Sequence, residues 1–201
     1  MKLKIEITSF AHIPYAKAIC QLIEESARER GIGRGKRQVA SIVEKIKTGH
    51  GIIALQDGEL AGFSYIEAWD NESFVVNTGL IVVAKFRTNG LATKIKTMAM
   101  ALATTKYPNA KLFSLTTTFA VMKMNSALGY QAVTYSELPK NPQFWEGCKS
   151  CPNYKTLQKK NHRMCFCTAM LLLANTDTLL DNSGNYSLNL PIEEVNYLQY
   201  I

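Results

Sequence analysis

The chain lacks any apolar run long enough to cross a bilayer. Its longest runs, such as Leu80–Ala84 and Ala169–Ala174, extend over six residues at most, whereas a membrane-spanning helix needs about 20. The start of the chain alternates charged and apolar residues and has no apolar leader. We therefore expect a cytoplasmic protein with no membrane partner.

Acidic residues are also scarce relative to basic ones. The 201 residues include 16 Asp and Glu against 23 Lys and Arg, a formal net charge of +7. Residues 141–201 carry five of each sign, so the whole excess belongs to residues 1–140. A basic region of this kind favours an anionic ligand such as a nucleic acid or a phosphorylated cofactor, although a solvated basic surface has the same composition.

Repeats and low-complexity tracts are absent, and 47% of the residues are hydrophobic, which excludes a disordered chain. Asp57 and Gly58 are typical of a hairpin turn. The order of the elements predicts an α+β fold, in which one sheet carries helices on both faces. Apolar periodicity predicts strands at 2–8, 51–55, 61–69, 74–83, 111–117 and 130–135, and helices at 11–30, 39–48, 91–102 and 119–128.

A basic loop with small residues joins the strand at 74–83 to the helix that begins near Leu91. Gly90 and Ala92 would let the backbone approach a ligand closely. The free N–H groups at the start of the helix, together with Arg87, would then favour a pyrophosphate. An ordinary strand-to-helix loop has similar small residues, so the loop by itself leaves both interpretations open.

The sequence Arg87-x-x-Gly90-x-Ala92 resembles the phosphate-loop signature of the GCN5-related N-acetyltransferase (GNAT) family. The order of elements and the helix ending in Leu-Gly-Tyr at Tyr130 are similar to that family over residues 3–137, about two thirds of the chain. The resemblance implies a mixed, mostly antiparallel, splayed sheet in an acetyltransferase domain at 1–140. It also implies acetyl-CoA, or a similar acyl-CoA, as the donor.

The family pattern implies which residues contact the donor. The pyrophosphate would lie on the backbone amides of 89–93, and the pantetheine beside 81–83, where the sheet splays. An amine would attack the thioester directly, and a backbone N–H near Val82 would stabilise the oxyanion. The implied CoA-binding residues are Ile81, Val82, Val83, Arg87, Thr88, Asn89, Gly90, Leu91, Ala92, Thr93 and Asn125.

The catalytic acid and base are less defined. Many family members have a tyrosine acid where this chain has Asn125, and an amide does not protonate a thiolate. Tyr130, a neighbouring tyrosine or water could replace it, or the thiolate could leave unprotonated. Glu67 and Glu72 are candidates for the general base, and each could equally be a surface charge.

A second resemblance concerns the acceptor. The strand that ends in Leu115–Thr117, the segment Gly31–Arg34 and the hairpin Ala54–Leu60 are similar to the acetyltransferase domain of N-acetylglutamate synthases. This resemblance implies a small acceptor with an amino acid α-amine, such as glutamate. It also implies that Arg34, Thr116 and Thr117 bind the acceptor. A protein N-terminus or a lysine side chain is the alternative acceptor.

Four of the five cysteines fall within residues 141–175. Cys148 and Cys151 form C-x2-C, and thirteen residues later Cys165 and Cys167 form C-x-C. Two such pairs can supply four thiolates to a tetrahedral Zn2+, so the spacing predicts a hairpin with a structural zinc site. Four buried free cysteines are the alternative.

The cysteine segment also supports a hypothesis of another class. Its basic and aromatic side chains could form a non-catalytic zinc knuckle that binds single-stranded nucleic acid. The segment lacks net positive charge, which makes a nucleic-acid partner the weaker interpretation. The tail at 176–201 is polar and then apolar, and we expect it to dock on the core or on a second subunit in a homodimer.

Overall fold

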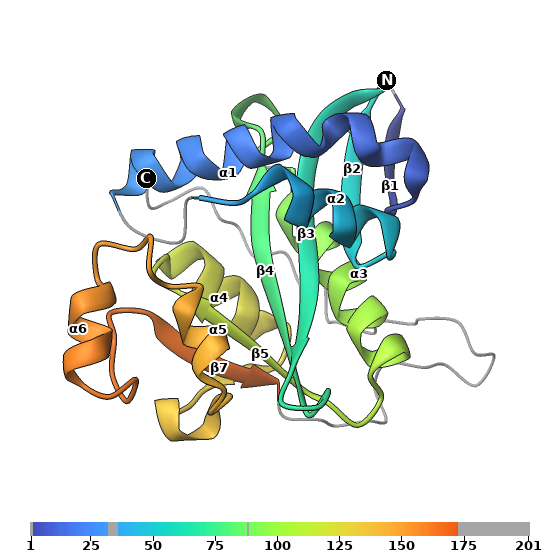
Figure 1. The fold of residues 1–201 in the computed structure, drawn as a ribbon. Coiled ribbons are helices and arrows are strands. Elements are labelled where there is room, and N and C mark those ends of the chain that lie inside the picture. The colour runs from blue at the N-terminus through green and yellow to red at the C-terminus, as the bar shows by residue number, and fades with distance from the viewer. Residues whose placement is uncertain (1, 32–35, 88, 173–201) are drawn as a thin grey trace.

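The computed structural model describes residues 2–31, 36–87 and 89–172. One seven-stranded sheet runs through the molecule in the order β1-β2-β3-β4-β5-β7-β6 (Figure 1). Neighbouring strands are antiparallel except for the parallel pair β4 and β5. The expected mixed, mostly antiparallel sheet is confirmed. The strands are β1 (Leu3–Ile7), β2 (Gly51–Gln56), β3 (Glu59–Trp69), β4 (Phe74–Val82), β5 (Lys111–Thr116), β6 (Tyr130–Ala132) and β7 (Thr168–Leu172).

Helices cover both faces of the sheet, as the sequence predicts. In Figure 1, α1 and α2 cross the face toward the viewer, and α3 lies behind it. No helix in the described ranges is long and apolar enough to cross a membrane. The helices are α1 (Ala16–Arg30), α2 (Val39–Lys47), α3 (Leu91–Lys106), α4 (Phe119–Ala127), α5 (Pro142–Glu146) and α6 (Tyr154–Lys159), with short 3-10 turns at Phe10–Tyr15, Ala84–Phe86 and Tyr135–Glu137.

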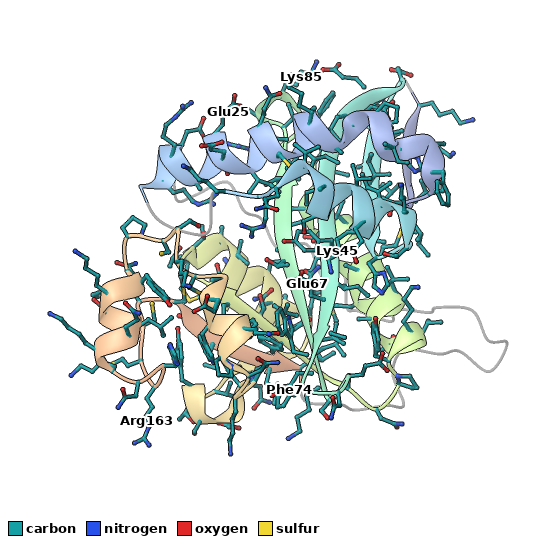
Figure 2. The ribbon with its side chains drawn as sticks, viewed as in Figure 1. Glu25, Lys45, Glu67, Phe74, Lys85 and Arg163 are labelled. Atoms are coloured by element: carbon teal, nitrogen blue, oxygen red, sulfur yellow. The ribbon has the colours of Figure 1, made fainter. Side chains whose placement is uncertain are left out.

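The central strands are apolar on both sides because each side meets a helix layer. Ile53 and Phe63 belong to the cluster under α1 and α2, whereas Ile52 and Ala54 belong to the cluster under α3. Neighbouring residues of a strand point to opposite faces, so the run at 52–54 supplies both clusters. The strand β4 extends over the height of the molecule, from Phe74 toward the loop that carries Lys85 (Figure 2).

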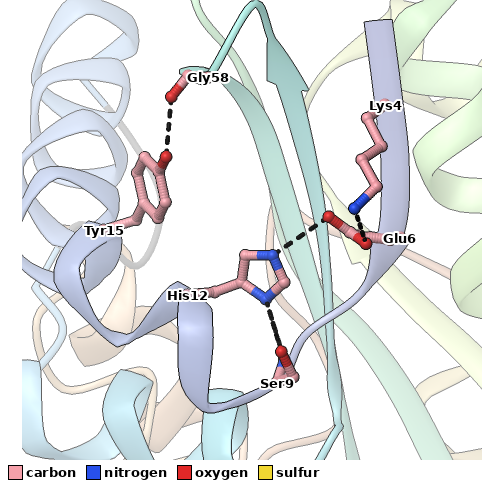
Figure 3. Close-up of polar contacts among 6 residues, drawn as sticks. All are labelled: Lys4, Glu6, Ser9, His12, Tyr15 and Gly58. Atoms are coloured by element: carbon pink, nitrogen blue, oxygen red, sulfur yellow. Dashed lines mark hydrogen bonds and ion pairs between the residues drawn. The ribbon is translucent and has the colours of Figure 1, made fainter.

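Polar contacts fix the beginning of α1 above the sheet (Figure 3). The ring of His12 accepts a hydrogen bond from the Ser9 backbone N–H at 2.9 Å, and its other nitrogen lies 3.2 Å from a Glu6 carboxylate oxygen. Tyr15 donates a hydrogen bond to the carbonyl of Gly58 at 2.7 Å, in the predicted β2–β3 turn. These contacts fix the start of α1, and Arg30 is the last residue of this helix.

Strand β7 was not predicted from the sequence. This strand follows the cysteine segment, yet it lies between β5 and β6 and pairs with both, Leu171 opposite Phe113 and Leu172 opposite Tyr130. The helices α5 and α6 pack on the same part of the sheet through a third apolar cluster, to which Phe144 and Leu157 contribute. The cysteine segment is therefore continuous with the sheet. The tail at 176–201 lies outside the described residues.

The sheet splays between β4 and β5. The two strands pair only over Phe74–Val76 and Lys111–Phe113, and beyond these residues β3 is the one described strand that pairs with β4. The splayed sheet that the GNAT resemblance implied is confirmed. Among the described residues, the backbone N–H and C=O groups of β4 that face the splay have no strand partner, so they can bind a ligand.

Candidate active site

A pocket opens where β4 and β5 separate. Its floor is β4 at 77–81 and its far wall is the end of β5 with the turn at 116–118. The end of α1 closes one side, and α6 with the cysteine segment closes the other. Of the residues that the structure describes, none that line the pocket is Asp or Glu, and three carry positive charge: Arg30, Arg37 and Lys96.

A β-bulge lies in the floor of this pocket. Phe63 pairs with Ile81 and Tyr65 pairs with Thr78, so β4 has one residue more than β3 between the two pairs. Gly79, within the bulge, has φ +66°, and a Cβ at this position would lie 2.5 Å from the Tyr65 ring. Glycine is therefore required here on both conformational and steric grounds.

The phosphate-loop motif lies at the end of this strand. Val82 accepts a hydrogen bond from Arg87 Nε at 3.1 Å, and Gly90 adopts φ +69° as the N-cap of α3. No side chain in the described part of the chain caps the helix, and the first N–H groups, at 91–93, have no partner in the helix. This 16-residue helix presents the donors and the dipole that suit a phosphate. Thr88 lies outside the described residues, and Asn89 is exposed.

Two guanidinium groups lie near the loop. Arg30, at the end of α1, lines the pocket, and burial together with the nearby Arg87 lowers its pKa. The two positive charges repel each other, and an anionic ligand bound between them would relieve this repulsion.

Lys96 lies on the buried face of α3 and is 1% exposed. Its ammonium donates to Asn77 Oδ1 at 3.0 Å and lies 4.9 Å from the centre of the Tyr130 ring. Asn77 in turn donates to Ser64 Oγ at 2.8 Å. Burial lowers the pKa of Lys96 to about 8. A fixed, buried cation thus lines the pocket.

Lys96 was not among the site residues predicted from the sequence. A signal was present, because the residues at helical spacings of −4, +3, +4 and +7 are Ala92, Ala99, Met100 and Ala103. A lysine in the middle of a small, apolar helix face is buried when the helix packs on a sheet.

Neither carboxylate considered as the base lines the pocket. Glu67 points toward Lys45 of α2 and pairs with it at 3.2 Å (Figure 2). Glu72 lies in the β3–β4 turn with φ +63° and is exposed. The structure therefore brings neither side chain together with the phosphate loop and the bulge.

Asn125 and Tyr130, the positions considered for the acid, are buried beside the pocket floor and do not line it. The Asn125 amide donates weakly to Met170 Sδ at 3.5 Å. Asn125 Oδ1 and the Tyr130 hydroxyl have no hydrogen-bond partner within the described part of the chain. Burial raises the pKa of Tyr130, so this phenol stays protonated at physiological pH.

The two threonines implied for the acceptor do line the pocket. Thr116 is buried, and its Oγ1 accepts from the Thr118 N–H at 3.1 Å, which shapes the turn after β5. Thr117 is half-buried. Arg34 lies outside the described residues, but Arg37 from the same basic loop lines the pocket and donates to the Tyr65 hydroxyl at 2.8 Å.

The predicted zinc site is not found. All four cysteines, Cys148, Cys151, Cys165 and Cys167, line the pocket, and burial with the neighbouring thiols raises the pKa of Cys167. Yet within 2–31, 36–87 and 89–172 no group of three or more His, Cys, Asp or Glu side chains is placed to hold a metal ion.

Apolar packing holds the cysteine segment instead. Phe144 makes T-shaped contacts with Trp69 and Phe113, and Trp145 stacks against Tyr135. Trp145 also donates to the Pro139 carbonyl at 2.9 Å. Cysteine spacing limits which ligand sets are conceivable, but it does not place the thiols in the geometry that a metal ion requires.

Comparison with solved structures identifies the fold. The N-acetylglutamate synthase of Neisseria gonorrhoeae, complexed with coenzyme A and N-acetylglutamate, matches with a TM-score of 0.61 at 19% identity. A GNAT-family acetyltransferase from Staphylococcus aureus matches with a TM-score of 0.55 at 12% identity, over 69% of this chain and 90% of that one. The chain has the GNAT fold.

The GNAT likeness extends over most of the chain. The synthase match covers 87% of this chain but only 36% of the synthase, so it spans about a third of the synthase's length. Diaminobutyrate acetyltransferase EctA from Paenibacillus lautus, in complex with 2,4-diaminobutyric acid and coenzyme A, matches with a TM-score of 0.57 at 9% identity, over 85% and 94% of the two chains. No family model and no curated protein sequence matches this chain.

Proposed function

We propose that this GNAT-fold chain transfers an acetyl or similar acyl group from CoA to the amine of a small acceptor, an amino acid α-amine such as that of glutamate. The observation that carries the proposal is the pocket at the bulge of β4, in which all the described charged lining residues are basic. The strand that forms its floor leads into the loop before the N-terminus of α3, where the first N–H groups have no partner in the helix. The fold shared with CoA-bound acetyltransferases supports it.

The donor would lie along the open side of β4. Its pyrophosphate would accept hydrogen bonds from the N–H groups at 91–93, with Arg87 and Arg30 nearby. Its pantetheine would lie along the backbone at 81–83 on the side away from β3, where no described strand is paired, as an added strand does. This placement brings the thioester to the bulge.

The transfer is a direct displacement. The amine lone pair attacks the thioester carbonyl carbon, and a backbone N–H of β4 near Val82 donates to the oxyanion. The C–S bond then breaks, and the CoA thiolate, whose pKa is moderate, leaves with the electron pair. Since no described carboxylate lines the pocket, the amine proton passes to water.

The test is CoA release measured by mass spectrometry, with acetyl-CoA or succinyl-CoA offered against amino acids, polyamines, and peptides with a free N-terminus or lysine. Turnover with an amino acid is the expected result. Turnover with peptides alone would favour the alternative protein acceptor. If the protein neither binds nor consumes acyl-CoA, the proposal fails, and salt-dependent RNA binding would test the nucleic-acid alternative.

Gly90→Val is expected to weaken CoA binding about tenfold, because a β-branched residue is strained at φ +69° and would shift the N–H groups of the loop. A Cβ at Gly90 meets nothing within 4 Å, so the fold should persist. Gly58→Val is the matched control, with φ +84° and equally open surroundings in a remote turn. Calorimetric affinities that fall equally in both variants would argue against the loop as the phosphate site.

Glu67→Gln is expected to leave kcat within about twofold of the wild type, because this carboxylate pairs with Lys45 outside the pocket. Stability should fall by at most about 1 kcal/mol, as for other partly exposed ion pairs. Lys45→Gln should produce the same small loss in thermal unfolding. A fall in kcat of more than tenfold with Glu67→Gln alone would identify this carboxylate as the base.

A further inference from the structure

The lining of the pocket is unbalanced in charge. Arg30, Arg37 and Lys96 line it, and no described Asp or Glu does. Arg30 and Arg37 also have protein partners outside the pocket, Ser26 and Tyr65. Lys96 is the cation that lies deepest, because it is almost fully buried between α3 and the sheet.

The ammonium of Lys96 has unused hydrogen-bonding capacity. It carries three N–H donors, and one is directed to Asn77 at 3.0 Å. The face of the Tyr130 ring supports the charge from another side. No described carboxylate pairs with Lys96, and burial is the sole cause of its lowered pKa. A buried ammonium with neutral neighbours is stabilised when an anion binds beside it.

Asn77 fixes where this charge lies. It belongs to β4, two residues before Gly79 of the bulge, and it donates to Ser64 and to the Tyr65 carbonyl. The Lys96–Asn77 pair is thus part of the same floor as the bulge to which the thioester would bind. In an amino acid one carbon separates the carboxylate from the amine. Such an acceptor can therefore place its carboxylate at Lys96 while its amine faces the thioester.

We propose that Lys96, held by Asn77, binds a carboxylate of the acceptor and so restricts the acceptors to amino acids and similar anionic amines. This inference rests on the proposed transferase function and adds its specificity residue. Polyamines, which are cationic, would be rejected by the same ammonium. The alternative anion at this position is a phosphate of the donor.

The experiment compares matched acceptors on matched variants. The acceptors are glutamate, its α-carboxamide and its side-chain amide, glutamine. The variants are Lys96→Met, Lys96→Arg and, as a control on the exposed face of the same helix, Lys94→Met. Lys96→Met should lower kcat/KM for glutamate about 10- to 100-fold, mainly through KM, as the loss of a charge-assisted hydrogen bond does.

The decisive readout is the ratio of kcat/KM between the acid and the amides. The wild type, Lys96→Arg and Lys94→Met should prefer glutamate over at least one of its amides, and Lys96→Met should lose that preference. A merely structural role for Lys96 would lower the acid and amide rates together. Thermal unfolding of each variant confirms that the compared proteins are folded.

Three results would overturn the inference. The first is a Lys96→Met variant that keeps the wild-type preference for the acid. The second is a variant whose KM rises for acyl-CoA and not for the acceptor, which would assign Lys96 to a donor phosphate. The third is a wild type that acetylates polyamines and ignores amino acids, which would leave the transferase function intact. A wild type that binds no acyl-CoA would overturn the proposed function and this inference together.

Discussion

Replacing Gly79 by alanine is expected to lower kcat by about 10²–10³-fold, the range observed when an oxyanion donor is lost. The bulge directs the backbone of β4 into the pocket, and Gly79 forms it with φ +66°. A methyl group there would be strained and would lie 2.5 Å from the Tyr65 ring. The ring or the bulge must shift, and either movement displaces groups that face the thioester. Pre-steady-state measurement of CoA release would report the change in the chemical step.

Two control variants distinguish a loss of catalysis caused by moving the bulge from a general loss of stability. Gly58→Ala also places alanine at a positive φ, but in open surroundings, so it should cost stability and spare kcat. Because Tyr65 holds Arg37 through its hydroxyl, Tyr65→Phe shows how much of any loss comes from releasing that arginine. A folded Gly79→Ala protein with wild-type kcat would show that the bulge does not position the oxyanion donor.

Lys96→Met is expected to stabilise the unliganded protein below pH 8 by about 3 kcal/mol. The folded pKa of Lys96 is about 8 against an ordinary value of 10.5. Between these two values the unfolded chain binds more protons than the folded one, so the free energy of unfolding of the wild type rises with pH. Below pH 8 both states are protonated, and the folded state bears the full cost of the buried charge. Methionine removes that cost and fills a similar volume.

The pH dependence distinguishes this effect from simple repacking. The stability difference between Lys96→Met and wild type should shrink from pH 8 upward and level off near pH 10.5, as measured by denaturant unfolding at each pH. Lys94→Met, on the exposed side of α3, should show a small difference that does not vary with pH. A difference for Lys96→Met that is constant from pH 6 to 11 would show that Lys96 does not titrate with a lowered pKa.

Most of the fold could be predicted because its elements are locally encoded. The turn at Asp57–Gly58 is set by residues that tolerate positive φ, and the apolar spacing of α1 and α3 sets the faces that they bury. The strand β7 was missed because 169–172 is a short run without alternation, which is equally compatible with a buried helix segment. Its partners β5 and β6 come much earlier in the chain, and nothing local specifies that order.

The site residues also fall into those that are encoded locally and those that depend on packing between distant elements. The phosphate loop is a contiguous motif, so Gly90 and Arg87 could be identified from sequence. The base was sought among carboxylates, but whether a side chain reaches a pocket depends on packing between distant elements. Glu67 faces Lys45 across two elements, and Lys96 is buried because α3 happens to present that side to β4. The zinc prediction from the cysteine spacing failed for a similar reason. Phe144 and Trp145 pack the segment against distant parts of the fold, and this packing is not visible in the spacing.

The position of β7 between β5 and β6 has a consequence for biosynthesis. On the ribosome, β6 emerges with no neighbour in the sheet, and it must wait for β7, its only partner strand among the described residues. The intervening stretch carries α5, α6 and the cysteines that wall the pocket, so the pocket closes in the same event that completes the sheet. A nascent chain released before Thr168 would present the edge of β5 to other chains, and such edges promote aggregation. Translation through β7 therefore couples solubility to the assembly of the pocket.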